Sequence, residues 1–361
     1  MNLKESEKFA RADLENLNYS GRIDFSDPLA PIFIFPASFI SMSFTGSKLK
    51  ILVKNNHSYY DNYIGYILDG LQRKILLLND KSIQEITLAS GLQHDKLHEV
   101  ILFKRQDACH EFTFYGFIIS KDSRIEKPNR KTRRCMEFYG DSVAVGELIE
   151  AKDYEDRPEI SHNGEYSNAW DSYAMMTARN LKTNVNIIAQ EGIALLNNAG
   201  RFHLQDKIGM ESIYDKLHFN PDLGNVTNWD FKEYTPQVVI IDIGQNDSLT
   251  DDYMKKNKDG DKAKIWKRHY KEFILNIREK YPHAFIVLTT TIMAHHPSWD
   301  RVIGLICQDI NDAKIIHFLY SCNGRNTSLS NNVWMAEQMS FELSMFLKGL
   351  GSRIWDTSKE Y

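Results

Sequence analysis

The sequence predicts two folds in series, an all-β sandwich followed by a doubly wound α/β domain. Between residues 20 and 120, short apolar runs alternate with polar residues and are separated by turn residues. Further along the chain, strand-like runs alternate with helix-like segments, as in a parallel sheet with helical crossovers. The polar stretch Ser120–Arg134, which contains Pro128, lies at this change of pattern. We therefore predict a sandwich domain over residues 1–125 and an α/β domain over residues 126–361.

The N-terminal region has the period-2 pattern of half-buried strands. Ile40, Met42 and Phe44 alternate with serines, and Asp69-Gly70 separates two apolar runs in the manner of a hairpin turn. Strands are expected over residues 40–44, 49–53, 63–68, 74–78, 98–103 and 111–119. Short strands with frequent turns and no helix-like stretch favour a β-sandwich.

The C-terminal region alternates two kinds of segment. Val238–Ile243 is a continuous apolar run, which is typical of a strand buried on both faces of a parallel sheet. Strands are expected over residues 135–139, 184–188, 238–243, 285–290 and 315–319, and helices over 168–181, 262–280, 299–310 and 333–347. Glu147–Glu150, which follows a turn of small residues, is a further candidate for the start of a helix. This order predicts a doubly wound α/β domain.

Composition and charge exclude several classes of partner. The 361 residues are 42% apolar and 25% charged, values typical of globular domains with sizeable cores. A net charge of −4 is not typical of proteins that bind nucleic acids, which are usually basic. No apolar run approaches the ~20 residues of a membrane span. The N-terminus lacks the apolar core of a signal peptide, and the four cysteines are scattered without metal-like spacing. We expect a cytoplasmic protein with reduced thiols that binds neither nucleic acid nor membrane; homo-oligomerisation is left open.

Three turns follow predicted strands of the α/β domain, where ligands bind in open parallel sheets. Gly140-Asp141-Ser142 has the form of a strand-to-helix turn that exposes a nucleophilic serine. Gly192 lacks a side chain, so its backbone N–H can approach a substrate closely, and Asn246 offers a side-chain amide. Acyl transfer needs a nucleophile and donors aimed at the developing oxyanion. The three turns together therefore predict an acyl-transfer site.

The motifs resemble those of the SGNH (GDSL-type) hydrolases, whose serine, glycine and asparagine blocks match Ser142, Gly192 and Asn246. A closer resemblance is to the family-two carbohydrate esterases, which join an N-terminal jelly-roll to an SGNH domain. The short sequence segments that resemble this family are spread over nearly the whole chain, at residues 21–24, 68–70, 103–106, 115–117, 166–179 and 234–239. The resemblance implies removal of acetyl groups from carbohydrate hydroxyls, without a metal or an organic cofactor.

One block departs from the family pattern. The family carries its catalytic histidine after the last strand, in an Asp-aromatic-His-Pro phrase, but Cys322–Ser330 contains neither Asp nor His. Because His295 and His296 follow the 285–290 strand, one of them is expected to serve as the base. Pro297 would stiffen this loop. Trp299 is a candidate for substrate contact, although burial in the core at the start of a helix is the favoured alternative for it. No acidic or cysteine partner stands near enough in sequence to favour metal binding by this histidine pair.

Two other histidines come into question as the base. His162 lies in a long loop after the nucleophile turn and could fold over the site, whereas His317 lies inside the last predicted strand. The sequence thus favours a serine esterase acting on acetylated carbohydrate. The alternatives are a catalytically silent relative that binds a carbohydrate or acylated ligand, and a structural or assembly role for the sandwich.

Overall fold

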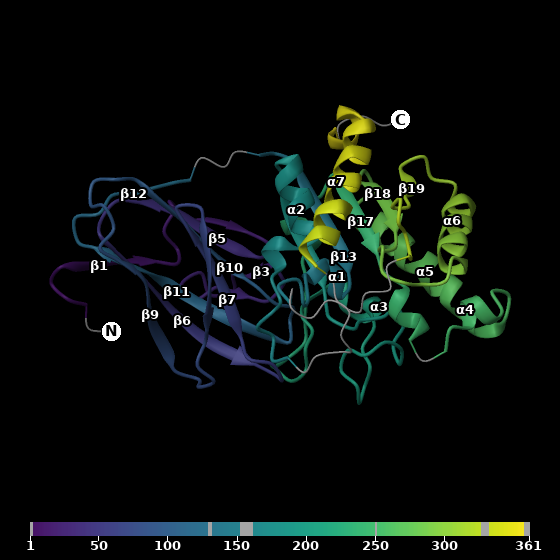
Figure 1. Cartoon of the computed structure of the whole chain (residues 1–361), viewed down its shortest axis with the longest axis horizontal. Helices are drawn as coiled ribbons and strands as arrows, with labels where there is room; N and C mark the ends of the chain where they lie inside the picture. The colour runs from purple at the N-terminus through teal and green to yellow at the C-terminus, as the bar shows by residue number, and fades with distance from the viewer. Residues whose placement is uncertain (1–2, 129–131, 152–161, 250, 326–331, 357–361) are drawn as a thin grey trace. The chain divides into compact units, whose positions relative to one another are not determined.

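The computed structural model describes residues 3–128, 132–151, 162–249, 251–325 and 332–356. The chain divides into two compact units (Figure 1). Unit 1 comprises Met1–Lys131, Asn163–Glu165 and Asn220–Val226, and unit 2 comprises Thr132–His162, Tyr166–Phe219 and Thr227–Tyr361.

Unit 1 is built from two antiparallel sheets. Its strands are β1 (Glu7–Arg11), β2 (Asn18–Ser20), β3 (Ile23–Asp24), β4 (Ile32–Phe33), β5 (Phe39–Phe44), β6 (Lys48–His57), β7 (Tyr63–Leu68), β8 (Leu71–Leu76), β9 (Ile83–Ser90), β10 (His98–Lys104), β11 (His110–Ser120) and β12 (Ile125–Glu126). One sheet has the order β3-β4-β11-β6-β9 with β1 beside β11. The other has the order β12-β5-β10-β7-β8 with β2 beside β5.

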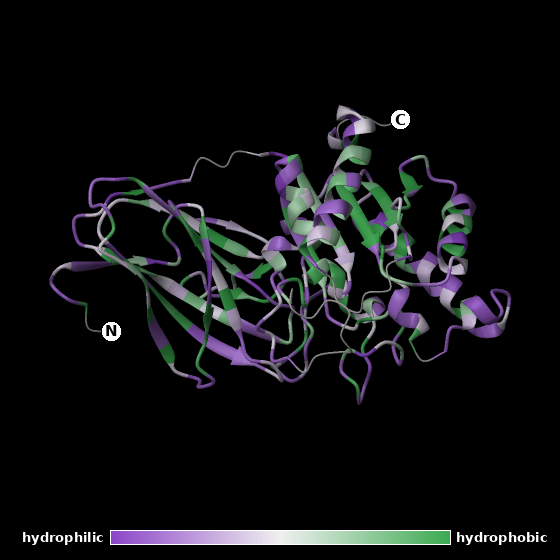
Figure 2. Ribbon diagram, in the orientation of Figure 1, coloured by the Kyte–Doolittle hydropathy of each residue, from purple (hydrophilic) through white to green (hydrophobic). Residues whose placement is uncertain are grey.

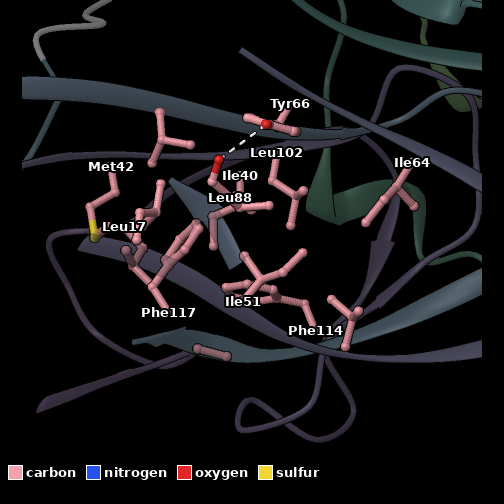
Figure 3. Close-up of a cluster of buried hydrophobic side chains, with 14 of the residues drawn as sticks. Leu17, Ile40, Met42, Ile51, Ile64, Tyr66, Leu88, Leu102, Phe114 and Phe117 are labelled. Atoms are coloured by element: carbon pink, nitrogen blue, oxygen red, sulfur yellow. Dashed lines mark hydrogen bonds between the residues drawn. The ribbon is translucent and has the colours of Figure 1, made fainter. Parts of the chain in front are cut away.

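Large apolar side chains from both sheets form the core of unit 1 (Figure 3). Ile40 and Leu102 come from one sheet, and Ile51 and Phe114 from the other; all four are fully buried. The Tyr66 hydroxyl, which lies in this apolar core, donates a hydrogen bond to the Leu88 carbonyl oxygen over 3.2 Å. The period-2 pattern therefore predicted which faces turn toward this core. The expectation that β5 is half-buried is wrong, because Ser41 and Ser43 on its other face are buried as well.

Unit 2 is built on a five-stranded parallel sheet of order β14-β13-β17-β18-β19. Its strands are β13 (Cys135–Gly140), β14 (Asn184–Ala189), β17 (Val238–Asp242), β18 (Phe285–Thr289) and β19 (Ile315–His317), with a separate pair β15 (Lys216–His218) and β16 (Thr227–Asn228). Its α-helices are α1 (Ser142–Val145), α2 (Tyr173–Leu181), α3 (Met210–Ile213), α4 (Tyr253–Lys256), α5 (Asp261–Lys280), α6 (Ser298–Ile310) and α7 (Val333–Gly349). Short 3-10 turns are η2 (Ala169–Asp171), η3 (Phe231–Glu233), η4 (Gln245–Ser248) and η5 (Ser352–Trp355).

Helices cover both faces of this sheet. Successive residues of a strand point to opposite faces. Accordingly, Phe138 packs edge-on against Tyr173 of α2, and Tyr139 packs edge-on against Phe273 of α5. Figure 1 shows α7 lying beside α2. The strands between these layers are strongly hydrophobic, as Figure 2 shows for β17 and β18.

The fold class predicted from the sequence is confirmed: an all-β sandwich precedes a doubly wound parallel sheet. Two details are wrong. No helix begins at Glu147, because Leu148 adopts a left-handed conformation with φ 55° and the helix instead begins at Ser142. The helix expected over 168–181 is interrupted at Ser172, whose extended backbone and side chain cap α2.

The described helices include none long and apolar enough to cross a membrane. The four cysteines form no disulfide.

Candidate functional site

Ser142 stands at the first position of α1, directly after the end of β13. The Asp141 side chain caps the helix by accepting from the Val143 N–H over 3.0 Å. A Cβ atom at Gly140 would lie 2.6 Å from the Ala144 Cβ, so glycine at that position lets the helix fold back against the strand. The local sequence thus holds a partly exposed serine at the end of a strand that has β14 and β17 as neighbours.

Gly192 lies in the loop after β14. Its φ of +68° belongs to the left-handed region that glycine adopts readily, and an added Cβ atom would lie 3.0 Å from the Arg201 Cβ. The Gly192 carbonyl oxygen accepts from the Arg201 N–H over 2.7 Å. This loop is therefore fixed by its own backbone contacts rather than by a side chain at position 192.

Asn246 lies in η4, directly after β17, and joins the other two turns. Its side-chain amide donates to the Ile193 carbonyl oxygen over 2.8 Å and to Asp141 Oδ2 over 3.3 Å. Ile193 follows Gly192 and Asp141 precedes Ser142, so one amide group touches the neighbours of both residues. The structure therefore brings the three residues predicted from the SGNH motifs to one place.

Asp247 fixes the backbone that follows the Gly192 loop. Its two carboxylate oxygens accept from the N–H groups of Leu195 and Leu196 over 2.8 Å and 3.2 Å. Burial raises the pKa of the Asp247 carboxyl to about 7, even though these donors favour its ionised form. A polar side chain in the core thus holds the loop through backbone hydrogen bonds.

A pair of buried acids lies beside the serine turn. Tyr173 donates its hydroxyl to Asp242 Oδ2 over 2.5 Å, and Asp242 Oδ1 has no hydrogen-bond partner among the described residues. Burial raises the pKa of both Asp141 and Asp242, and the charge of Asp141 raises the pKa of Asp242 further. Asp242 is therefore the member of the pair that holds its proton more tightly.

His295 lies in a closed network at the carboxyl edge of β18. Its Nδ1 lies 2.7 Å from the Met293 carbonyl oxygen, and its Nε2 lies 3.1 Å from both carboxylate oxygens of Asp300. Asn323 and Thr290 also contact Nε2, at 3.2 Å and 3.3 Å. Burial lowers the pKa of His295, but the hydrogen bond and charge of Asp300 outweigh it, so the pKa is raised. Because a carbonyl oxygen only accepts, Nδ1 must donate, and the imidazole is best described as a cation with both N–H groups bonded.

His296 and Trp299 have local partners. His296 Nδ1 lies 3.0 Å from the Ser298 hydroxyl oxygen and 3.3 Å from the Ser298 backbone nitrogen, so this ring nitrogen bonds within its own loop. Trp299 is fully buried, stands edge-on to Trp266, and donates its indole N–H to Asp252 Oδ1 over 3.0 Å. The prediction that Trp299 contacts substrate is therefore wrong, because a side chain in the core offers no face to a sugar.

No hydrogen bond joins Ser142 Oγ to any histidine within the described residues, whereas the sequence favoured His295 or His296. Part of the family's histidine block, residues 326–330, lies outside the described residues. Its first part contacts His295 instead: the Gly324 carbonyl oxygen accepts from the His295 N–H over 3.3 Å.

A second group of side chains near the serine turn was not predicted as a unit. Glu147, His162 and Glu191 place one ligand-type atom each within 4.8 Å of one another, and they are the sole such group of three in the described chain. His162 Nε2 lies 3.5 Å from Glu147 Oε1, and these two side chains are 7% and 14% exposed. Glu191 adjoins Gly192, and this adjacency was the available signal in the sequence.

Comparisons with known proteins show what this chain is similar to. Residues 19–128 match the family described as carbohydrate esterase 2 N-terminal. The chain is 30% identical over 303 residues to cellulase/esterase CelE of Acetivibrio thermocellus, which covers 83% of this chain and 34% of that protein. It therefore spans about a third of the length of that curated relative. It is also 24% identical over 279 residues to an acetylxylan esterase/glucomannan deacetylase of Cellvibrio japonicus, covering 76% of this chain and 71% of that protein.

The fold also matches solved structures. A family two carbohydrate esterase from Clostridium thermocellum, in complex with cellohexaose, superposes with a TM-score of 0.78 at 26% identity. The match covers 93% of this chain and 99% of that one. The chain thus carries the N-terminal domain of carbohydrate esterase family 2 and is a relative of its members, with an SGNH-type α/β domain.

Proposed function

We propose that this protein is a carboxylic ester hydrolase that removes acetyl groups from carbohydrate hydroxyls through an acyl-enzyme on Ser142. The observation that carries the proposal is the Asn246 amide, which contacts the neighbours of Ser142 and of Gly192. The named activities of the relatives, acetylxylan esterase and glucomannan deacetylase, support the choice of substrate.

The arrangement suits acyl transfer. The Ser142 hydroxyl would attack the acetyl carbonyl carbon, and the charge that develops on the carbonyl oxygen needs fixed donors. The backbone N–H groups of Ser142 and Gly192 and the Asn246 amide would supply them. In this mechanism the Asn246 amide must exchange its contact with Ile193 or Asp141 for the oxyanion.

A second candidate function is the binding of a carbohydrate without hydrolysis. The observation that favours it is the closed network around His295, because an imidazole with both nitrogens bonded cannot accept the serine proton. Both candidates share a carbohydrate ligand and differ in chemistry. Cytoplasmic location and oligomeric state remain predictions.

The test is acetate release by the purified protein. Wild type and Ser142→Ala are incubated with acetylated xylo- or gluco-oligosaccharides, and free acetate is measured over time. We expect wild type to release acetate and Ser142→Ala to be slower by at least ~10⁴-fold, since the covalent route is lost. Binding of the oligosaccharide by wild type without acetate release would favour the second candidate.

A further inference from the structure

The group Glu147, His162 and Glu191 has no role in the function derived so far. We propose that His162 is the general base of the esterase, with Glu147 and Glu191 holding its imidazole and stabilising its charge. This inference rests on the proposed function. It assigns the proton acceptor to a loop that precedes β14, rather than to the end of the sheet where the family has its histidine.

The chain connects this group to both halves of the site. The Glu147 N–H donates to the Ser142 carbonyl oxygen over 3.1 Å, so Glu147 lies one helical turn from the nucleophile. Glu191 is covalently adjacent to Gly192, the proposed oxyanion donor. An imidazole that meets both carboxylates within 4.8 Å therefore lies between the nucleophile loop and the oxyanion loop.

The other histidines of the α/β domain near this edge are committed elsewhere. His295 has both nitrogens bonded, and His296 Nδ1 bonds Ser298 in its own loop. His317 lies within β19 and faces α6, where its Nδ1 would be 3.0 Å from a Cβ atom on Gly304. Among the described residues, His162 is the histidine that combines a buried side chain with carboxylate partners in the segments that adjoin Ser142 and Gly192.

The chemistry is that of a Ser–His–Glu arrangement. His162 accepts the Ser142 hydroxyl proton as Oγ bonds to the acetyl carbon, and it returns that proton to the sugar oxygen as the ester bond breaks. A water molecule then gives a proton to His162 and attacks the acetyl-serine, and the proton returns to Ser142 Oγ as acetate leaves. Glu147 Oε1, 3.5 Å from His162 Nε2, would hold the ring in place during both steps. The serine–histidine hydrogen bond of such sites often tightens only when substrate binds.

Imidazole rescue tests the assignment. Acetate release is measured for wild type, His162→Ala, and the control His283→Ala, which removes an exposed histidine before β18. We expect His162→Ala to lower kcat by roughly 10²–10⁴-fold with partial recovery in added imidazole, and His283→Ala to match wild type. Glu147→Gln and Glu191→Gln should each cost less than His162→Ala. His162→Gln, which keeps a polar side chain there, serves if the alanine variant does not fold.

Each other outcome overturns the assignment in a recognisable way. Full activity of folded His162→Ala, with Ser142→Ala inactive, would leave the esterase proposal standing and place the base elsewhere. Loss of wild-type activity in EDTA, restored by Zn²⁺ or Mn²⁺ and without imidazole rescue of the variant, would make the group a metal site. An inactive wild type would remove the esterase proposal together with this one.

Discussion

The carboxyl edge of the parallel sheet has two contrasting halves. The turns after β13, β14 and β17 hold a partly exposed serine, and Asn246 links them to one another. The turns after β18 and β19 instead close on each other, because His295 bonds Asp300 and Asn323 and its N–H reaches the Gly324 carbonyl oxygen. Both halves are rich in polar groups. In the first half the Ser142 side chain is partly exposed, whereas in the second half the His295 imidazole is bonded at both nitrogens.

The contrast shows that a histidine at the correct sheet edge is not sufficient for catalysis. A base needs a nitrogen lone pair directed at its proton donor. His295 has the partners of a catalytic histidine, a carboxylate and a carbonyl oxygen, yet they occupy both nitrogens. We interpret the His295 network as a structural link that fixes the loop after β19.

After the nucleophile and the proposed base, the largest effect should follow from removing the Asn246 amide. Asn246→Ala is expected to lower kcat by roughly 10²–10³-fold with little change in KM, because its N–H acts on charge that develops in the transition state. Asn246→Asp, which keeps the size but replaces the donor with a negative charge facing Asp141 and the oxyanion, should cost at least as much. Steady-state acetate release on an oligosaccharide series measures both constants. A change confined to KM would make Asn246 a contact to the bound sugar instead.

Removing the His295 imidazole should weaken the fold more than the chemistry. His295→Ala leaves the mostly buried Asp300 carboxylate without its cation and is expected to reduce the free energy of unfolding by about 3 kcal/mol. Asp300→Asn is the matched variant. Urea unfolding gives the stability, and kcat at a temperature where the variants are folded gives the chemistry. A folded His295→Ala with lost turnover and rescue by imidazole would reverse the comparison.

The Asp247 carboxyl should make stability depend on pH. Burial raises its pKa to about 7 in the folded state, above the ordinary value of 3.8, so the folded protein binds more protons than the unfolded chain between these values. Stability should therefore fall by about 2–3 kcal/mol as pH rises from 5 to 8. Urea unfolding across this range, compared with Asp247→Asn, isolates the contribution. An equal slope in the variant would contradict it.

The smallest effect is expected from Trp299. Trp299→Phe removes the indole hydrogen bond to Asp252 and should cost about 1 kcal/mol of stability, while kcat and KM stay at wild-type values. Thermal unfolding and acetate release measure the two quantities. A raised KM at unchanged stability would return Trp299 to the substrate site.

The sequence predicted well what depends on short repeating patterns. Alternation placed the sandwich strands, and the apolar run at Val238 placed a strand covered on both faces. It misplaced the helix after the nucleophile, because Val143-Ala144-Val145 has weak helix propensity and the cap at Asp141 decides the start. The sequence contains the signal for this cap, because aspartate at position 141 is a favoured N-cap residue.

The partners of each histidine could not be read in this way. The bonds of His295 come from residues up to 29 positions away. The group of Glu147, His162 and Glu191 brings together residues that are far apart in the sequence. Such long-range contacts depend on the paths of the loops at the edge of the sheet. The periodicity of apolar residues along the sequence does not predict these paths. Burial of Trp299 is of the same kind, since an aromatic residue at a helix start suits either core or surface.

The order of strands in the sheet also determines how long a newly synthesised strand waits for its neighbour. β13 lies between β14 and β17, but β17 begins roughly 100 residues after β13 ends, which takes about 5–20 s of synthesis at ordinary rates. During that interval the growing chain carries β13 with one edge unpaired, and this strand includes Phe138 and Tyr139. An unpaired apolar strand edge invites pairing with other chains. Nascent chains stalled before Val238 should therefore be the aggregation-prone species, and they should be bound by chaperones more than chains that have passed Asp242.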